Sequence, residues 1–242
     1  MIIDSSLNKI KMYDWVLFDA DETLFHFDAF GGLKLMLSQF NVDFTLQNYE
    51  EYQKGNKVLW TEYQNGKITA RDVKNRRFDS WAAFLKVSAE ELNSRFLQTV
   101  ADLCAPIEGA VSLLHALKGK AKLGIITNGF TELQHIRLER TGLRDFFEVL
   151  VISEEVGFAK PDRRIFDHAL AMMGNPERSR VLIVGDTAES DIRGGIDSGL
   201  DTCWFNASRK DIPDGIIPHY QVFSLKELED LLVGEKAPRI VS

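Results

Sequence analysis

The sequence contains few cysteines, and their positions exclude two common roles. Its 242 residues include two cysteines, Cys104 and Cys203, which lie far apart. Neither belongs to a Cys-x-x-Cys pair or stands beside a cluster of histidines, the patterns typical of zinc sites. We therefore expect two buried free thiols, with neither a zinc site nor a disulfide framework.

Long apolar segments are also absent. No stretch of about 18 consecutive apolar residues occurs, so no transmembrane helix is predicted. The N-terminal segment MIIDSSLNKI lacks the cationic start and the apolar run of a secretory signal peptide. These absences favour a cytoplasmic protein that does not enter a membrane.

Positive charge is scarce as well. The chain has 29 Lys and Arg residues against 36 Asp and Glu residues, which gives a formal net charge of −7. A protein that binds a nucleic acid polymer or an anionic membrane over a broad surface usually carries a positive patch or stripe. Such partners are therefore not expected, and a small phosphorylated ligand would need a local positive site.

What the sequence does contain is typical of a globular α/β protein. Hydrophobic residues make up 45% and charged residues 27% of a chain that is longer than most single domains. Short apolar runs predict strands at Trp15–Phe18, Leu123–Ile126, Val149–Ile152, Leu182–Val184, Thr202–Phe205 and Tyr220–Phe223. Helices are predicted at Ala110–Lys118, at Pro161–Met173, and after the capping-box spacing Ser224-Leu-Lys-Glu227. This alternation predicts a doubly wound, Rossmann-like parallel sheet.

One region interrupts the alternation. Between Phe30 and Pro106 about 75 residues have helical patterning and no convincing strand, which is far longer than an ordinary connection. Four helices are predicted there, at Gly32–Phe40, Leu46–Tyr63, Thr69–Leu85 and Ala89–Cys104. The predicted organisation is a discontinuous α/β core at 12–29 and 107–236, an inserted helical bundle at 30–106, and loose termini at 1–11 and 237–242.

Polar residues follow three of the predicted strands and precede one helix. They are Asp19 and Asp21, Thr127-Asn128-Gly129, Lys160-Pro161, and Gly185-Asp186 with Asp191. Each group alone has an ordinary structural explanation, such as a turn, a helix cap or a solvated lysine. Because open α/β sheets bind ligands beyond the carboxyl ends of their strands, however, we expect all four groups to meet in one crevice.

The combined inventory suits phosphoryl transfer. Carboxylates and a backbone carbonyl are the ligands that Mg²⁺ prefers. Thr127, the amides of Asn128 and Gly129, and Lys160 are candidates to hold phosphate oxygens. Asp19 is a candidate nucleophile, and Asp21 could protonate the leaving oxygen.

In order and spacing, the four groups resemble the four motifs of the haloacid dehalogenase superfamily. They are Asp19-x-Asp21-x-Thr23, Thr127-Asn128-Gly129, Lys160-Pro161 and Gly185-Asp186-x-x-x-x-Asp191. The insert resembles the helical cap of part of that superfamily. Within the superfamily, six longer stretches are more closely similar to the bacterial pyrimidine 5′-nucleotidases. They are FDADETLF, YQNGKIT, GIITNGF, IRLERTGLRD, VISEEVG and VGDTAESDI. That group hydrolyses dUMP, dTMP, UMP and related nucleotides in nucleotide-pool house-cleaning.

The resemblance implies a mechanism. Asp19 attacks phosphorus to form an aspartyl-phosphate, and Asp21 protonates the 5′-oxygen and then activates water. Mg²⁺, for which Mn²⁺ or Co²⁺ can substitute, is held by the Asp19 carboxylate, the Asp21 main-chain carbonyl and Asp186. Asp191 is not expected to bind the metal directly, but to orient waters or Lys160.

Position 21 is the most diagnostic, because dehalogenases and phosphonatases of the superfamily lack an acid there and transport ATPases carry Thr. A phosphatase for phosphoglycolate or a sugar phosphate, and a phosphomutase, remain alternatives. A phosphoaspartate signalling module is a further one, opposed by Asp21 and by the long insert.

Specificity is expected to come from the insert and from the loop after Asp19. The candidates are His26, Phe27, Phe30, Asn56, Trp60 and Phe130. Aromatic residues at helical spacing are also typical of a bundle core, and His26 is interpreted as a packing or gating residue. The cluster Lys74, Arg76 and Arg77 is predicted to be a solvated helix face.

Overall fold

The computed structural model describes residues 12–234, and a six-stranded parallel sheet lies at its centre. The strands are β1 (Trp15–Phe18), β2 (Lys122–Thr127), β3 (Val149–Ile152), β4 (Val181–Gly185), β5 (Asp201–Phe205) and β6 (Tyr220–Val222). Their order is β3-β2-β1-β4-β5-β6, and every neighbouring pair is parallel. The predicted doubly wound sheet is therefore confirmed. The predicted loose termini, and residues 235–236 of the predicted core, lie outside the described residues.

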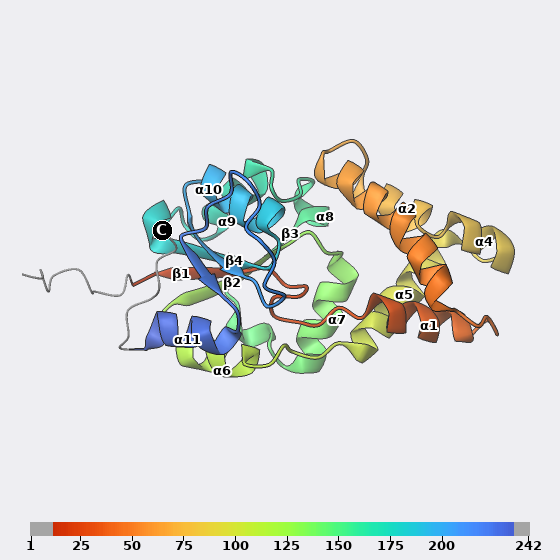
Figure 1. Ribbon diagram of the computed structural model, residues 1–242, viewed down its shortest axis with the longest axis horizontal. Coiled ribbons are helices and arrows are strands. Elements are labelled where there is room, and N and C mark those ends of the chain that lie inside the picture. The colour runs from red at the N-terminus through yellow and green to blue at the C-terminus, as the bar shows by residue number, and fades with distance from the viewer. Residues whose placement is uncertain (1–11, 235–242) are drawn as a thin grey trace, which may run out of the picture.

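Both faces of the sheet are buried under helices, as Figure 1 shows. Residues of β1 alternate between two clusters: Val16 and Phe18 pack with helices α6 (Ala110–Leu117) and α11 (Leu225–Val233). Trp15 and Leu17 pack on the other face, against α9 (Arg163–Met172). A strand buried on both sides has apolar residues at consecutive positions, which explains why the runs in the sequence are continuous.

The remaining core helices connect successive strands. They are α7 (Thr131–Thr141), α8 (Ser153–Val156) and α10 (Arg193–Asp197), with short turns at Arg144–Phe146, Arg178–Arg180 and Ala188–Ile192. The helix predicted from Pro161 begins at Arg163. Asp162 is its N-cap residue, because the Asp162 side chain accepts a hydrogen bond from the Arg164 amide. Among the described helices, none is long and apolar enough to cross a membrane.

The insert folds into helices and forms a cap beyond the carboxyl ends of the strands (Figure 1). Its helices are α1 (Ala29–Ser38), α2 (Leu46–Gln64), α3 (Ala70–Arg76), α4 (Asp79–Leu85) and α5 (Ala89–Leu103). The prediction of one helix over Thr69–Leu85 is wrong, because the chain leaves helical geometry at Phe78, with φ −116° and ψ 1°. Arg77 and Phe78 are both buried at this break, so tertiary packing overrides a continuous helical pattern.

Cap and core share a contact surface. The apolar cluster of the cap includes Phe130, Leu133 and Ala159 from the core. The buried hydroxyl of Tyr63 on α2 donates to Ser153 Oγ at the start of α8, at 2.7 Å. Lys74 on α3 forms an ion pair with Glu154 on α8 and is mostly buried, so its prediction as a solvated residue is wrong.

Candidate active site

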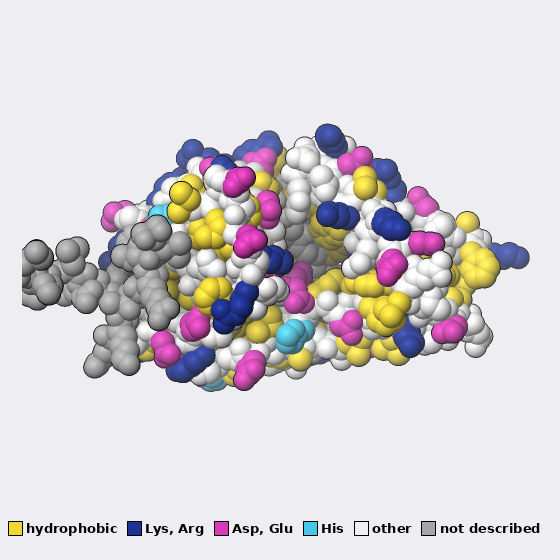
Figure 2. Space-filling model, viewed as in Figure 1, with side chains coloured by type: hydrophobic (Ala, Val, Ile, Leu, Met, Phe, Trp, Pro, Cys, Tyr) yellow, Lys and Arg dark blue, Asp and Glu magenta, His cyan; other side chains and the backbone are white. Residues whose placement is uncertain are grey.

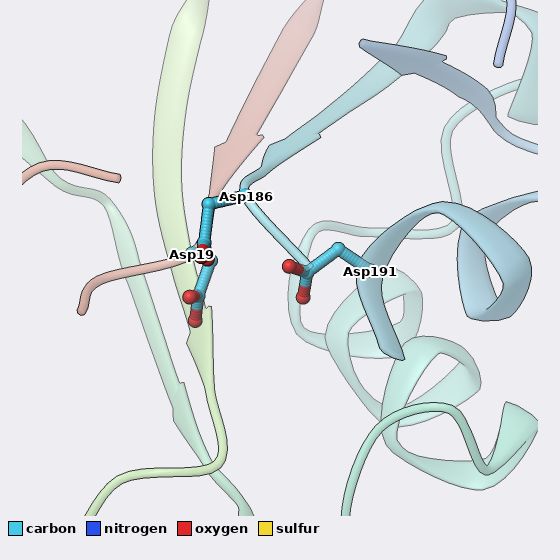
Figure 3. A group of neighbouring side chains, drawn as sticks. All are labelled: Asp19, Asp186 and Asp191. Carbon is cyan, nitrogen blue, oxygen red and sulfur yellow. The ribbon is translucent and has the colours of Figure 1, made fainter. Parts of the chain in front are cut away.

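Three carboxylates converge beyond the carboxyl ends of β1 and β4. Asp19 directly follows β1, Asp186 directly follows β4, and Asp191 lies in the turn Ala188–Ile192. One oxygen from each lies within 4.8 Å of the others, and Figure 3 shows Asp191 reaching toward the other two from the helical turn. The Asp19 amide donates to the Val184 carbonyl at 2.8 Å, which fixes Asp19 against the neighbouring strand.

Lys160 supplies the positive charge at this cluster. Its ammonium group lies 2.7 Å from Asp19 Oδ1, 2.6 Å from Asp191 Oδ1 and 2.8 Å from the Ile126 carbonyl oxygen. The residue is 2% exposed. Burial acts to lower its pKa, but the two carboxylates outweigh burial and raise it, so Lys160 stays charged.

One lysine does not balance the surrounding acids. Burial, reinforced by Asp191 and Asp21 and opposed by Lys160, raises the pKa of Asp19 to about 7. Burial, reinforced by Asp191 and Asp19, raises the pKa of Asp186 to about 8. Buried carboxylates that repel one another form a set of hard oxygen donors, which fits a divalent cation such as Mg²⁺.

The side chains around the cluster are held by their own hydrogen bonds. Asp191 Oδ2 accepts from the Thr187 amide at 3.0 Å, so both oxygens of Asp191 have protein partners. Trp204 Nε1 donates to the Asp186 carbonyl at 2.8 Å and fixes the backbone there. A Cβ on Gly185 would meet the Asp191 side chain at 2.3 Å, so Gly185 makes room for this carboxylate.

Asn128 joins two of the sequence motifs. Its Oδ1 accepts from the Lys160 amide at 2.7 Å, and its Nδ2 donates to the Lys160 carbonyl at 2.9 Å. The peptide bond from Lys160 to Pro161 is cis. Beside it, the Gly129 amide donates to Thr127 Oγ1 at 3.0 Å. The Asn128 side chain therefore orients Lys160, and the Gly129 amide predicted to meet phosphate has an internal partner.

Asp21 has a partner that the sequence did not reveal. Its Oδ1 accepts from Arg137 Nη1 at 2.5 Å, and the Arg137 side chain is completely buried. Arg137 lies on α7 between the buried residues Leu133 and Leu138. A signal did exist, since arginine interrupts the buried stripe of a helix that follows the Thr127-Asn128-Gly129 motif.

The carboxylate cluster lies at the end of a cavity between core and cap, with a volume of about 400 Å³. Figure 2 shows the surface hollowed between the two parts. The cavity is lined by every proposed catalytic, phosphate-binding or metal-binding residue except Asp191, and also by Phe27, Asn56, Trp60 and Phe130. His26 and Phe30 are not among the lining residues. The His26 side chain is exposed, and its backbone amide donates to Ala105 at 3.0 Å.

Arg77 was placed wrongly by the sequence analysis. It is 8% exposed and lines the cavity, whereas it was predicted on a solvated face. Its guanidinium carbon lies 4.9 Å from the Phe96 ring centroid and 5.1 Å from that of Phe130. Its Nε and Nη2 both donate to Asn93 Oδ1. Arg77 is therefore part of the cap interior and contributes a cation to the cavity wall.

This fold, with Asp19, Lys160 and Asp186 beyond the strand ends and a helical cap above them, defines a class of hydrolases. Residues 13–199 match the haloacid dehalogenase-like hydrolase family, and the chain belongs to that family. The resemblance that the four motifs indicated is confirmed.

Individual relatives cover almost the whole chain. Pyrimidine 5′-nucleotidase YjjG of Escherichia coli (strain K12) is 58% identical over 220 residues, which are 91% of this chain and 98% of that protein. Pyrimidine 5′-nucleotidase PynA of Streptococcus pneumoniae (strain ATCC BAA-255 / R6) is 30% identical over 91% of this chain and 95% of its own. The crystal structure of the HAD-hydrolase YfnB from Bacillus subtilis, bound to magnesium, has a TM-score of 0.80 at 32% identity, covering 92% of this chain and 99% of that one.

Proposed function

We propose that this hydrolase removes phosphate from pyrimidine nucleoside 5′-monophosphates. The observation that carries the proposal is the placement of Asp19, Lys160 and Asp186 at one end of a cavity that Asp21 also lines. The similarity to two pyrimidine 5′-nucleotidases supports the substrate class. We further propose a nucleotide-pool house-cleaning role in the cytoplasm. The net charge of −7 is unfavourable for a polymeric nucleic acid substrate.

Asp19, Asp186 and the main-chain carbonyl of Asp21 are the proposed ligands of Mg²⁺, or of Mn²⁺ or Co²⁺ in its place. When bound, such a cation would neutralise charge on the phosphate and on the buried carboxylates. Asp191 is proposed to act indirectly, because its oxygens are taken by Lys160 and the Thr187 amide. Its task is to hold Lys160 against Asp19.

Two chemical steps follow from these roles. First, an Asp19 carboxylate oxygen forms a bond to phosphorus while the bond from phosphorus to the 5′-oxygen breaks, and Asp21 donates its proton to that oxygen. Then Asp21 accepts a proton from water, the water oxygen bonds to phosphorus, and the bond to Asp19 breaks. Lys160 reduces the repulsion between the Asp19 carboxylate and the phosphate throughout. Thr127 and the amides of Asn128 and Gly129 are proposed to hold phosphate oxygens, the Gly129 amide after it leaves Thr127.

The nucleoside is proposed to occupy the cap end of the cavity. Trp60 and Phe130 have ring centroids 5.2 Å apart, and both line the cavity together with Phe27 and Asn56. Flat apolar walls of this kind stack on a nucleobase. The volume of about 400 Å³ is in the range of small-molecule sites. His26 does not line the cavity and is not proposed to contact the substrate.

A substrate panel tests the proposal. Phosphate release would be measured with Mg²⁺ and with EDTA on UMP, dUMP, dTMP, purine monophosphates, phosphoglycolate and sugar phosphates. We expect metal-dependent turnover that favours the pyrimidine nucleotides. Equal or better turnover of sugar phosphates or phosphoglycolate would contradict the nucleotidase assignment, and phosphate transfer to a sugar hydroxyl would indicate a mutase. Absence of turnover on every ester would leave a signalling role in its place.

A further inference from the structure

Arg137 is a cation buried in the core beside the proposed acid. Its side chain has no exposed surface, and its only ion pair within residues 12–234 is with Asp21, whose side chain is 29% exposed. Lys160, by contrast, contacts Asp19 and Asp191 and makes no ion pair with Asp21 in this part of the chain. The proposed nucleophile and the proposed acid are therefore paired with two different cations, Lys160 and Arg137.

Gln134 and Phe25 hold the guanidinium of Arg137 in place beside Asp21. Arg137 Nη2 donates to Gln134 Oε1, one turn earlier on α7. The guanidinium carbon lies 4.8 Å from the centroid of the Phe25 ring. A Cβ on Gly129 would lie 2.4 Å from Gln134 Nε2 and 3.2 Å from Asp21 Oδ2, so the absence of a side chain at Gly129 leaves room for both residues.

Packing alone does not explain an arginine at this position. Taking a guanidinium out of water is unfavourable, and an apolar residue of similar volume would fill the space between Phe25 and α7 without that penalty. Arg137 Nε has no hydrogen-bond partner among the described residues, and the only other side chain hydrogen-bonded to the guanidinium besides Asp21 and Gln134 in this part of the chain is the Cys104 thiol, which does not require a charged neighbour. What distinguishes arginine here is the fixed, charged contact with Asp21.

We propose that Arg137 is a positioning residue for Asp21 in the leaving-group step, an inference that rests on the proposed phosphatase activity. Arg137 holds Oδ1 of Asp21, which leaves Oδ2 for proton exchange with the substrate. When Asp21 donates its proton to the ester oxygen, the new carboxylate already lies against a cation. The Arg137 contact therefore matters most where the leaving group needs a proton.

The test compares two esters that differ in this need. The 5′-oxygen of UMP leaves poorly as an alkoxide and requires the proton, whereas p-nitrophenolate is a stable anion that leaves without one. The measured quantity is kcat/KM, because it reports the steps up to departure of the leaving group. For Arg137→Met we expect a loss of about 100-fold on UMP, at the lower end of general acid effects, and a change within about threefold on p-nitrophenyl phosphate.

Two further variants keep the test independent of one substitution. Arg137→Lys retains a cation without the planar fork and is expected to recover part of the loss on UMP. Gln134→Leu removes the anchor but leaves the arginine, and a smaller loss in the same direction is expected. Arg140→Met is the matched control, since Arg140 lies on the same helix and pairs with Asp102 at the exposed surface. It should change kcat/KM for neither ester.

A second measurement separates positioning from folding. Binding of beryllium fluoride with Mg²⁺, followed as a thermal shift, requires the Asp19 and Lys160 side of the site and should be retained in Arg137→Met. Equal losses on both esters, or no loss on UMP, would overturn the role of Arg137. If the unsubstituted enzyme hydrolysed neither ester, the proposed function itself would fail, a result distinct from a missing difference between the esters.

Discussion

The core and the cap build their shares of the cavity in different ways. In the core, Asp19 and Asp186 each stand one residue beyond a strand, and polar contacts of 2.6 to 2.8 Å fix Lys160 between Asp19, Asp191 and the Ile126 carbonyl. At the cap end, Trp60 of α2 lies against Phe130 of the core loop after β2, with 5.2 Å between the ring centroids. Rigid strand ends suit chemistry, which needs accurate placement, and an aromatic wall suits recognition of a flat ligand.

Outside the shared apolar cluster, mainly polar contacts join the cap to the core. Tyr63 bonds to Ser153, Lys74 pairs with Glu154, and Ser94 Oγ on α5 donates to Glu132 on α7 at 2.6 Å. Glu154 also accepts from the Thr131 amide at 3.0 Å, so it links the cap to the first turn of α7. Because the charged cluster lies in the core and Trp60 lies in the cap, changes in the core should affect catalysis, and changes in the cap should affect substrate choice.

The largest effect should come from the nucleophile. Asp19→Asn keeps the shape but removes the attacking carboxylate, so turnover should fall on the order of 10⁴-fold or more for every ester. Trapping of a phosphoaspartate analogue with beryllium fluoride should also be lost. Asp14→Asn, at an exposed pair with Arg180, is the control and should keep full activity. Retained turnover in Asp19→Asn would refute a covalent route.

The next effect concerns the proposed metal ligands. Because a ligand that binds only the folded state stabilises it, Mg²⁺ at 100 times its dissociation constant should add about 2.7 kcal/mol to the free energy of unfolding. Differential scanning fluorimetry with Mg²⁺ and with EDTA would detect this as a rise in Tm. Asp186→Asn should reduce that rise. A full Mg²⁺-dependent rise in this variant would remove Asp186 from the ligand set.

The cap side of the comparison is tested by Trp60. Trp60→Ala removes one wall of the proposed base site, so kcat/KM for UMP should fall roughly 10- to 100-fold, as expected for loss of one stacking contact. Turnover of p-nitrophenyl phosphate should stay within a few fold. Trp81→Ala is the matched control, since Trp81 contacts Phe44 and Phe84 and does not line this cavity. An equal loss of kcat/KM on both esters would mean that Trp60 stabilises the cap and does not contact the base.

The smallest effect is expected at the boundary. Tyr63→Phe removes the 2.7 Å hydrogen bond to Ser153 and should lower the free energy of unfolding by about 1 kcal/mol. Urea denaturation of Tyr63→Phe, Ser153→Ala and the double variant would measure the coupling between the two residues. Strict additivity of the two single effects would mean that the contact does not join cap and core.

Much of the core could be predicted from sequence because its information is local. Continuous apolar runs mark strands buried on both faces, and the residue after each run is necessarily at the edge of the sheet. Asp19, Thr127 and Asp186 could therefore be placed together before any coordinates were known. The helix ends in the core differ by a residue or two from the prediction, as where Asp162 caps α9.

The cap was harder to predict because helical periodicity does not say which neighbour a face meets. The break at Phe78 and the burial of Arg77 both depend on α5, where Asn93 accepts from Arg77 and Phe96 lies against Phe78. The same limit applies to Arg137 in the core. Its partner Asp21 lies 116 positions away in the chain, and no local pattern reports such a pair.

The sequence by itself determined the family, the parallel sheet, the helical insert and the set of residues beyond the strand ends. Strand ends and motif spacing are local properties, and parallel strands bring their carboxyl ends to one edge. Tertiary structure alone decided which charges are neutralised: Lys160 between Asp19 and Asp191, Arg137 on Asp21, and Arg77 within the aromatic wall. A buried charge is stable only beside particular partners, and those partners come from distant parts of the chain that meet only in the folded state.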